Sequence, residues 1–299
     1  MRLPTAGELN ERFGVHEIVR FEEVPRGFVR AAVTTRDAEA HVYLHGAHVT
    51  HYRPRQQRPV LFLSAGTRFE RGLPIRGGVP VVFPWFGPRP GHPRSPAHGV
   101  ARTAIWQVET ASPDGALVLR LTAEDVAWSQ AFALRHRVRV GASLELSLEA
   151  ENASGHALAF EEALHTYLAV SDVRSIGISG LGGATYLDKT RAMARTLEEH
   201  DPLRLTAETD RVYVGTNATC VIDDPGWGRR LVVDKAGSRT TVVWNPWSVK
   251  ARAITDFVAE EWSRMICVET ANVGDDTVVL PAGGRHTLRT IIRSDVLGS

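Results

Sequence analysis

The sequence predicts an all-β fold, a large antiparallel sandwich with few short helices, on the basis of three observations. Residues 132–140 and 143–152 alternate strictly between apolar and polar side chains, as strands with one wet face do. Further short strand-like runs are separated by turn residues at intervals typical of sandwiches. Helical patterns are few and short, at residues 7–14 and 124–131.

The two alternating segments are predicted to pair as a hairpin. Gly141 lies in the short stretch between them, where a turn is needed. The wet face of the first segment carries arginines and that of the second carries glutamates, so we expect cross-strand ion pairs. Further strands are expected at residues 27–35, 40–46, 104–110, 116–124, 230–237 and 240–246.

Composition excludes several classes of protein. The 299 residues are 43% hydrophobic and 23% charged, as in ordinary globular chains, and the net charge of +1 gives no general attraction to nucleic acid or membranes. The N-terminus lacks the apolar core of a signal peptide, and no apolar run is long enough to span a bilayer. Cys220 and Cys267 do not form a disulfide framework. We therefore expect one domain over residues 1–299, located in the cytoplasm as a monomer.

Two titratable residues interrupt apolar strand-like runs. His165 lies in "EEALHTYLAV" and is either a core histidine bonded to backbone or a general acid that titrates near neutral pH. Glu269 lies in "RMICVETANV" and is either a strand-end carboxylate facing water or a general base with a pKa set by partial burial.

The segment from residue 75 to 102 is too apolar for a surface linker and has an arginine near each end. Arg76 precedes two glycines, which can let backbone approach a ligand closely, and Arg102 closes "HGVAR". An arginine fork matches the oxygens of a phosphate, although each arginine could equally pair with a surface acid. His98 could donate to a hydroxyl or simply be exposed.

Metal and nucleotide motifs are weaker. His41, His45, His48 and His51 cluster in "HVYLHGAHVTHY", but their spacing does not match a helical zinc motif, and accidental clustering is the favoured interpretation. The glycines at residues 180–183 lack the strand–glycine–helix setting and the lysine–serine pair of a phosphate-binding loop. We therefore expect no metal site.

Seven motifs, taken together, carry a resemblance to a known family. The chain resembles the glucose-6-phosphate 1-epimerases, or hexose-6-phosphate mutarotases, of the aldose 1-epimerase superfamily, over residues 42–292. The motifs are "IRGGVPVVFPWFGP", "AHGVAR", "ALHTYLAV", "SGLGGATYLDKT", "TDRVYVG", "VVWNPW" and "MICVETANV". The resemblance implies a galactose-mutarotase-like β-supersandwich.

The resemblance also implies roles for individual residues. His165 is similar to the general acid of the family and Glu269 to its general base. The implied substrate contacts are Asp210 and His98 for sugar oxygens, Arg76 and Arg102 for the phosphate, and Arg68 and Arg71 as possible further phosphate contacts. Four aromatic residues could stack on a sugar or pack in the core, namely Trp85, Phe86, Trp244 and Trp247.

The implied activity is interconversion of the α and β anomers of glucose 6-phosphate by acid–base ring opening and closure. This chemistry needs no metal, nucleophile or redox cofactor, so no cofactor is expected and the partner is a small hexose 6-phosphate. Three alternatives remain: an epimerase of unphosphorylated sugars, a non-catalytic sugar-phosphate sensor, and a glycoside hydrolase or lyase. A hydrolase would use two carboxylates, whereas here a histidine is the partner of Glu269.

Overall fold

The protein is described from a computed structural model that covers residues 4–298. Its N-terminal part is a short helix and a four-stranded antiparallel sheet in the order β1-β2-β3-β4. The helix, α1 (Ala6–Phe13), confirms the first helical prediction and begins at Thr5, whose hydroxyl and backbone exchange hydrogen bonds with Glu8. The strands are β1 (Val19–Val24), β2 (Phe28–Thr34), β3 (Ala38–Tyr43) and β4 (His48–Pro54).

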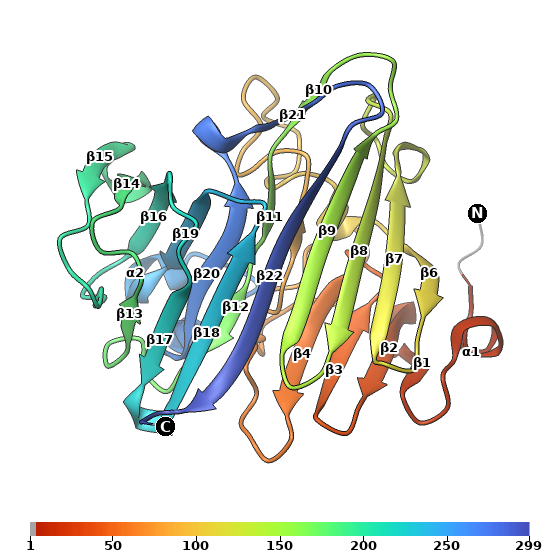
Figure 1. Cartoon of the computed structure of the whole chain (residues 1–299), viewed down its shortest axis with the longest axis horizontal. Helices are drawn as coiled ribbons and strands as arrows, with labels where there is room; N and C mark the ends of the chain where they lie inside the picture. Colours follow the sequence, from red (N-terminus) through yellow and green to blue (C-terminus); the bar gives the residue numbers. More distant parts are fainter. Residues whose placement is uncertain (1–3, 299) are drawn as a thin grey trace.

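A long antiparallel sheet, which we call the backing sheet, runs across the front of Figure 1. Its order is β13-β17-β18-β22-β9-β8-β7-β6. The strands are β6 (Gln107–Ala111), β7 (Ala116–Thr122), β8 (Phe132–Val140), β9 (Leu144–Asn152), β13 (Gly177–Ser179), β17 (Cys220–Asp224), β18 (Arg229–Ala236) and β22 (Arg285–Val296). The predicted hairpin is the β8–β9 pair, and its expected ion pairs form, as between Arg139 and Glu145 at 2.7 Å.

A second eight-stranded sheet, the site sheet, lies behind one half of the backing sheet, and the N-terminal sheet lies behind the other half (Figure 1). Its order is β15-β14-β16-β19-β20-β11-β5, and β12 also pairs with β20. The strands are β5 (Val81–Val82), β11 (Glu162–Leu164), β12 (Tyr167–Ala169), β14 (Thr185–Asp188), β15 (Ala194–Leu197), β16 (Thr209–Val214), β19 (Thr240–Asn245) and β20 (Met265–Asn272). A small sheet pairs β10 (Leu158–Phe160) with β21 (Val278–Leu280).

The two faces of the site sheet have different surroundings. On β20 the even-numbered Ile266 and Val268 belong to the large core cluster shared with the backing sheet. The odd-numbered Met265, Cys267 and Ala271 belong to two smaller clusters outside that core. Because side chains alternate along a strand, Glu269 must project from the outer face with the odd-numbered set. The outer face of the site sheet is therefore where the predicted base lies.

The helical content is small, and together with the antiparallel sheets it confirms the predicted fold class. The other helical segments are α2 (Trp247–Ala251) and the 3₁₀ turns at Pro25–Gly27, Ala101–Thr103, Ala123–Asp125, Lys189–Arg191, Pro225–Trp227, Ala259–Arg264 and Gly274–Asp276. Within residues 4–298, no helix is both long and apolar enough to cross a membrane.

The helix predicted at residues 124–131 is wrong. Only the 3₁₀ turn at Ala123–Asp125 forms there, because the Asp125 carboxylate reaches back to the backbone and hydroxyl of Thr122 and closes the turn at once. The following residues form no helix: Val126 is extended, the chain then bends, and Trp128 packs its ring against Phe83 and Phe132. Tertiary packing of one aromatic ring therefore overrides a weak local helical preference.

Candidate active site

Strand register brings the predicted acid and base together. Tyr167 pairs with Cys267, so His165, two residues earlier, lies opposite Glu269 on the neighbouring strand. The Nδ1 atom of His165 lies 3.4 Å from Oε1 of Glu269. Both side chains are almost fully buried, at 9% and 1% exposure. Residues more than 100 positions apart in the sequence are thus neighbours on the outer face of the site sheet.

The pair lies in a setting that disfavours charge. Burial raises the pKa of Glu269 well above its ordinary value. Burial, and then electrostatic interaction with His98 and Arg102, lower the pKa of His165 well below its ordinary value. Nδ1 of His165 and Oε2 of Glu269 also lack a hydrogen-bond partner within the described residues. The pair can therefore pass a single proton between acid and base at low cost, since neither charged form is strongly held.

The apolar segment between the two arginines forms a wall beside this pair. Strand β5 pairs with β11, and the backbone carbonyls of Gly78 and Pro80 accept from the amides of Tyr167 and His165. The sequence suggested that the glycines after Arg76 let the backbone approach a ligand, but the structure gives them a packing role. Gly77 and Gly78 have positive φ angles, and a Cβ on either would strike backbone of Phe62 or Val49. Close packing of the wall explains them.

His98 enters the site with its ring in a defined tautomer. The amide of Gly87 donates to Nδ1 of His98 at 3.3 Å, so Nε2 carries the hydrogen and can donate it. Burial, and then the charges of Arg102 and Lys189, lower the pKa of His98 and keep the ring neutral. Its ring lies 5.6 Å from that of His165, edge to face. His98 is a half-buried residue with a φ of 62°, an uncommon backbone conformation that is often found at functional sites.

Arg76 is held next to the histidine by Tyr167 and Asp256. The ring of Tyr167 stacks on that of His165 at 4.8 Å, and its hydroxyl accepts from Nη1 of Arg76 at 3.1 Å. Asp256 accepts from Nε of Arg76 at 3.2 Å. Burial lowers the pKa of Arg76, but Tyr167 and Asp256 outweigh it and raise the pKa overall. Arg76 is thus a fixed cation whose three guanidinium nitrogens each contact Tyr167 or Asp256.

Arg102 differs because its charge has no counter-ion. Its Nη2 donates to the carbonyl of Ala97 at 2.6 Å, and its Nε has no partner. Across residues 4–298 no carboxylate forms an ion pair with it. Burial, with the charge of Arg76 in addition, lowers the pKa of Arg102 to about 10. A desolvated and unpaired guanidinium is costly, which is typical of a site that receives an anionic ligand.

Asp210 forms the opposite side of the site. It projects from the outer face at the start of β16, since it pairs with Trp244, which in turn pairs with Cys267. Nζ of Lys189 lies 3.2 Å from Oδ1 of Asp210 and 5.4 Å from the centroid of the Phe86 ring. This arrangement presents a carboxylate and an ammonium side by side, which suits recognition of neighbouring sugar hydroxyls.

The remaining predicted contacts are less central. Arg68 donates to the carbonyl of Thr255, next to the partner of Arg76, at 3.4 Å. Arg71 donates instead to the carbonyl of Gly27 at 3.0 Å, beside the N-terminal sheet. Of the four aromatic residues, Phe86 contacts His98 and Trp244 contacts His165, whereas Trp85 is buried and Trp247 packs on Trp262.

The four histidines in and between β3 and β4 do not point toward one common site. His45 and His48 are buried and each bonds a backbone carbonyl, of Leu73 and Gly77. His51 bonds Glu39 at 3.1 Å, and His41 lies beside it with Arg30 as a neighbour. The four rings therefore have separate structural partners.

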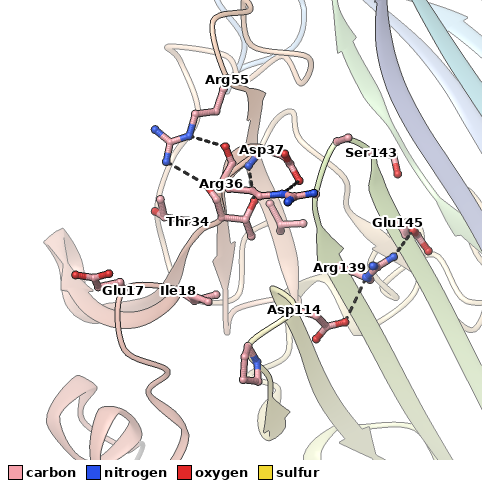
Figure 2. Close-up of a pocket in the computed structure, with 15 residues that line it drawn as sticks. Glu17, Ile18, Thr34, Arg36, Asp37, Arg55, Asp114, Arg139, Ser143 and Glu145 are labelled. Atoms are coloured by element: carbon pink, nitrogen blue, oxygen red, sulfur yellow. Dashed lines mark hydrogen bonds and ion pairs between the residues drawn. The ribbon is translucent and has the colours of Figure 1, made fainter.

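A cavity of about 710 Å³ lies elsewhere, where the β2–β3, β6–β7 and β8–β9 turns meet (Figure 2). Two of its arginines have protein partners. Arg55 donates to the carbonyls of Thr35 and Arg36, and Arg139 pairs with Asp114 and Glu145. None of the predicted site residues lines it. Of the two arginines, only Arg139 has carboxylate partners among residues 4–298.

Three residues of the site were missed by sequence reasoning, namely Tyr167, Lys189 and Asp256. Tyr167 and Lys189 lie inside the motifs "ALHTYLAV" and "SGLGGATYLDKT", so their positions offered a signal. Asp256 lies in an irregular loop after α2 with no motif around it, and only its ion pair with Arg76 at 3.1 Å identifies it.

Comparisons with known proteins show the family of the chain. The aldose 1-epimerase family profile matches residues 31–293. A protein of Cenchrus ciliaris named "Putative glucose-6-phosphate 1-epimerase" is 33% identical over 275 residues, covering 87% of this chain and 83% of that protein. A protein of Escherichia coli K12 with the same name is 32% identical over 83% of this chain and 84% of its own length.

A solved structure extends the likeness to three dimensions. The crystal structure of a "putative mutarotase (YeaD)" from Salmonella typhimurium superposes with a TM-score of 0.88 at 27% identity, covering 95% of this chain and 96% of that one. The family match spans nearly the whole chain and includes both His165 and Glu269. The chain therefore belongs to the aldose 1-epimerase family, as its sequence motifs predicted.

Proposed function

We propose that the protein is a hexose-6-phosphate mutarotase that interconverts the α and β anomers of glucose 6-phosphate and related aldohexose 6-phosphates. The family supports an epimerase, and the names of the relatives support a phosphorylated substrate. The observation that carries the phosphate part of the proposal is the buried, unpaired charge of Arg102 close to Arg76.

Ring opening follows from the acid–base pair. Glu269 takes the proton of the anomeric hydroxyl while His165 gives a proton to the ring oxygen, and the C1–O5 bond breaks to leave an open aldehyde. The aldehyde turns about its C1–C2 bond. The two proton transfers then run in reverse and close the ring on the other face of the carbonyl carbon.

The electrostatics of the pair suit this cycle. Before ring opening the pair carries one proton as imidazolium and carboxylate. Afterwards it carries one proton as imidazole and carboxylic acid, so no proton is exchanged with solvent. Burial favours the uncharged forms of His165 and Glu269, which are the forms present while the ring is open. The pair thereby offsets part of the cost of the open intermediate.

The remaining residues bind and orient the sugar. Arg76 and Arg102 hold the phosphate, and binding energy at this remote group positions the reacting carbon. His98 donates from Nε2 to a sugar oxygen, and Asp210 accepts from sugar hydroxyls with Lys189 beside it. The site would still act on unphosphorylated sugars, but without the binding energy that the phosphate contributes.

The test is the rate of α–β exchange of glucose 6-phosphate measured by NMR, with unphosphorylated glucose and galactose run alongside. We expect strong acceleration with the phosphate ester that is lost in His165→Ala and Glu269→Gln, each by about 10²–10⁴-fold. Wild-type binding of glucose 6-phosphate without acceleration would instead indicate a sensor. Faster exchange of the free sugars than of the ester would indicate an aldose epimerase.

A further inference from the structure

A third ligand-type atom lies beside the acid–base pair. Cys267 is two residues before Glu269 on β20, so both side chains project from the same outer face. Its thiol, a ring nitrogen of His165 and a carboxylate oxygen of Glu269 all lie within 4.8 Å of one another. Within residues 4–298 this is the one group of three such side chains with that spacing.

The three atoms match what a thiophilic divalent cation needs. Zinc is bound by cysteine, histidine and carboxylate at about 2.0–2.3 Å, which separates its tetrahedral ligands by roughly 3.3–3.8 Å. His165 Nδ1 and Glu269 Oε1 are 3.4 Å apart and already meet that spacing. His165 Nδ1 and Glu269 Oε2 also lack hydrogen-bond partners among the described residues, so a metal would displace no protein contact at those atoms.

From this geometry we infer that His165, Cys267 and Glu269 form an inhibitory site for Zn²⁺ inside the catalytic centre. The three protein ligands leave a fourth position open for water or a sugar oxygen. A bound cation occupies the histidine nitrogen and the carboxylate that the proposed reaction uses for proton transfer. Binding of metal and ring opening are therefore mutually exclusive.

The surrounding charges decide how selective the site is. Arg76, Arg102 and Lys189 act on the pair electrostatically and oppose entry of any cation. A hard ion such as Mg²⁺, which binds oxygen ligands and keeps its waters, gains little here. Zn²⁺ gains a thiolate bond and releases the thiol proton to solvent, since the ligand must be deprotonated. Inhibition should therefore be specific to thiophilic metals.

The experiment uses the full chain, ZnCl₂ and CoCl₂ as probes, and two matched variants. Cys267→Ala removes the proposed ligand, whereas Cys220→Ala removes the other buried free cysteine, which lies on the backing sheet. We expect zinc to inhibit glucose 6-phosphate exchange reversibly with EDTA. Even loss of an outer-shell partner typically weakens metal affinity about 10–100-fold, so Cys267→Ala should raise the half-inhibitory zinc concentration by at least about tenfold. Cys220→Ala should leave it unchanged.

Cobalt gives a readout that does not depend on turnover. A cobalt–thiolate bond produces a charge-transfer absorption in the near ultraviolet, which we expect in the wild type and Cys220→Ala but not in Cys267→Ala. If Cys267→Ala does not fold, Cys267→Ser tests the same point. Absence of the band in the wild type, or equal zinc sensitivity of both variants, overturns the proposal. Only the inhibition assay rests on the proposed function, so the cobalt spectrum distinguishes failure of the metal site from failure of the enzyme assignment.

Discussion

Replacing Arg102 by methionine should stabilise the ligand-free protein and weaken its action on the phosphorylated sugar. Methionine keeps most of the side-chain volume but removes the charge. Arg102 has a buried guanidinium whose Nε has no partner, so the folded protein bears a desolvation cost that the unfolded chain does not. Most substitutions of buried residues destabilise a protein, and the opposite sign is therefore diagnostic.

The size of each effect can be worked from the site. Burial lowers the pKa of Arg102 from 12.5 to about 10, and each unit corresponds to about 1.4 kcal/mol, so the charged form costs at most about 3–4 kcal/mol. The side chain is half-buried by surface area, so we expect a gain of about 1–2 kcal/mol in the free energy of unfolding. Below the folded pKa, Arg102 is charged in both states, but the unfolded state binds this proton more tightly, so the charge destabilises the fold. Removing the charge should therefore raise the free energy of unfolding. Loss of a charge-assisted bond to phosphate, about 1.5–3 kcal/mol, lowers kcat/KM for glucose 6-phosphate by about 10–150-fold.

Two assays on the same preparations decide the matter. Chemical denaturation without ligand gives the free energy of unfolding, and NMR exchange gives kcat/KM for glucose 6-phosphate and for glucose. Arg71→Met, at an exposed arginine bonded to a backbone carbonyl, is the matched control and should change neither quantity much. A destabilised Arg102→Met that loses both substrates equally would show that the arginine is structural, and the reasoning would be refuted.

Three further predictions concern proton transfer and the scaffold. The pair His165 and Glu269 should give a bell-shaped profile of kcat/KM against pH, because the reaction needs one proton on the pair. Burial moves the first proton loss of the pair below the ordinary histidine pKa of about 6.5 and the last above the ordinary glutamate pKa of about 4.3. A value of kcat/KM that does not change over the pH range where the protein is folded would contradict this prediction. Burial also raises the pKa of Glu162, so the folded state keeps this proton longer than the unfolded chain, and the free energy of unfolding should fall as pH rises above about 4.3. Glu162→Gln should reduce that fall in denaturation curves and leave the part due to Glu269, and an unchanged pH dependence would show that Glu162 does not contribute to it. Gly78→Ala should lower the free energy of unfolding by about 2–4 kcal/mol in the same assay, since the φ angle of Gly78 is positive and the added methyl group would strike backbone. Gly72 also has a positive φ angle but faces open space, so Gly72→Ala should cost less. Equal losses of stability in the two variants would mean that packing is not the cause.

The strands were the most predictable part of the molecule. Residues 132–140 alternate between buried and accessible along their whole length in the structure, as their sequence alternates between apolar and polar. Period-two patterning depends only on the chain and on the presence of one core face, so a single sequence reveals it. The helix predicted at 124–131 had no comparable pattern, and the packing of Trp128 decided its conformation.

The site was partly predictable because its acid, base and arginines lie in motifs that resemble a known family. The roles of the neighbours were not. The glycines after Arg76 suggested a ligand, but contacts with distant backbone explain them, and no local pattern reports such a contact. Asp256 and Lys189 act through ion pairs with Arg76 and Asp210, and the partners in such pairs lie far apart in the sequence.

By itself, the sequence determined the all-β class and the hairpin, and it supplied the candidate residues for the chemistry. Only the tertiary structure decided that His165 lies opposite Glu269 and that Cys267 lies beside the pair. It also showed that Arg76 has a counter-ion, whereas Arg102 has none among residues 4–298. The physical reason is that strand alternation is a property of neighbours along the chain. Register between strands, burial and the balance of charge depend on segments that the fold brings together from distant positions.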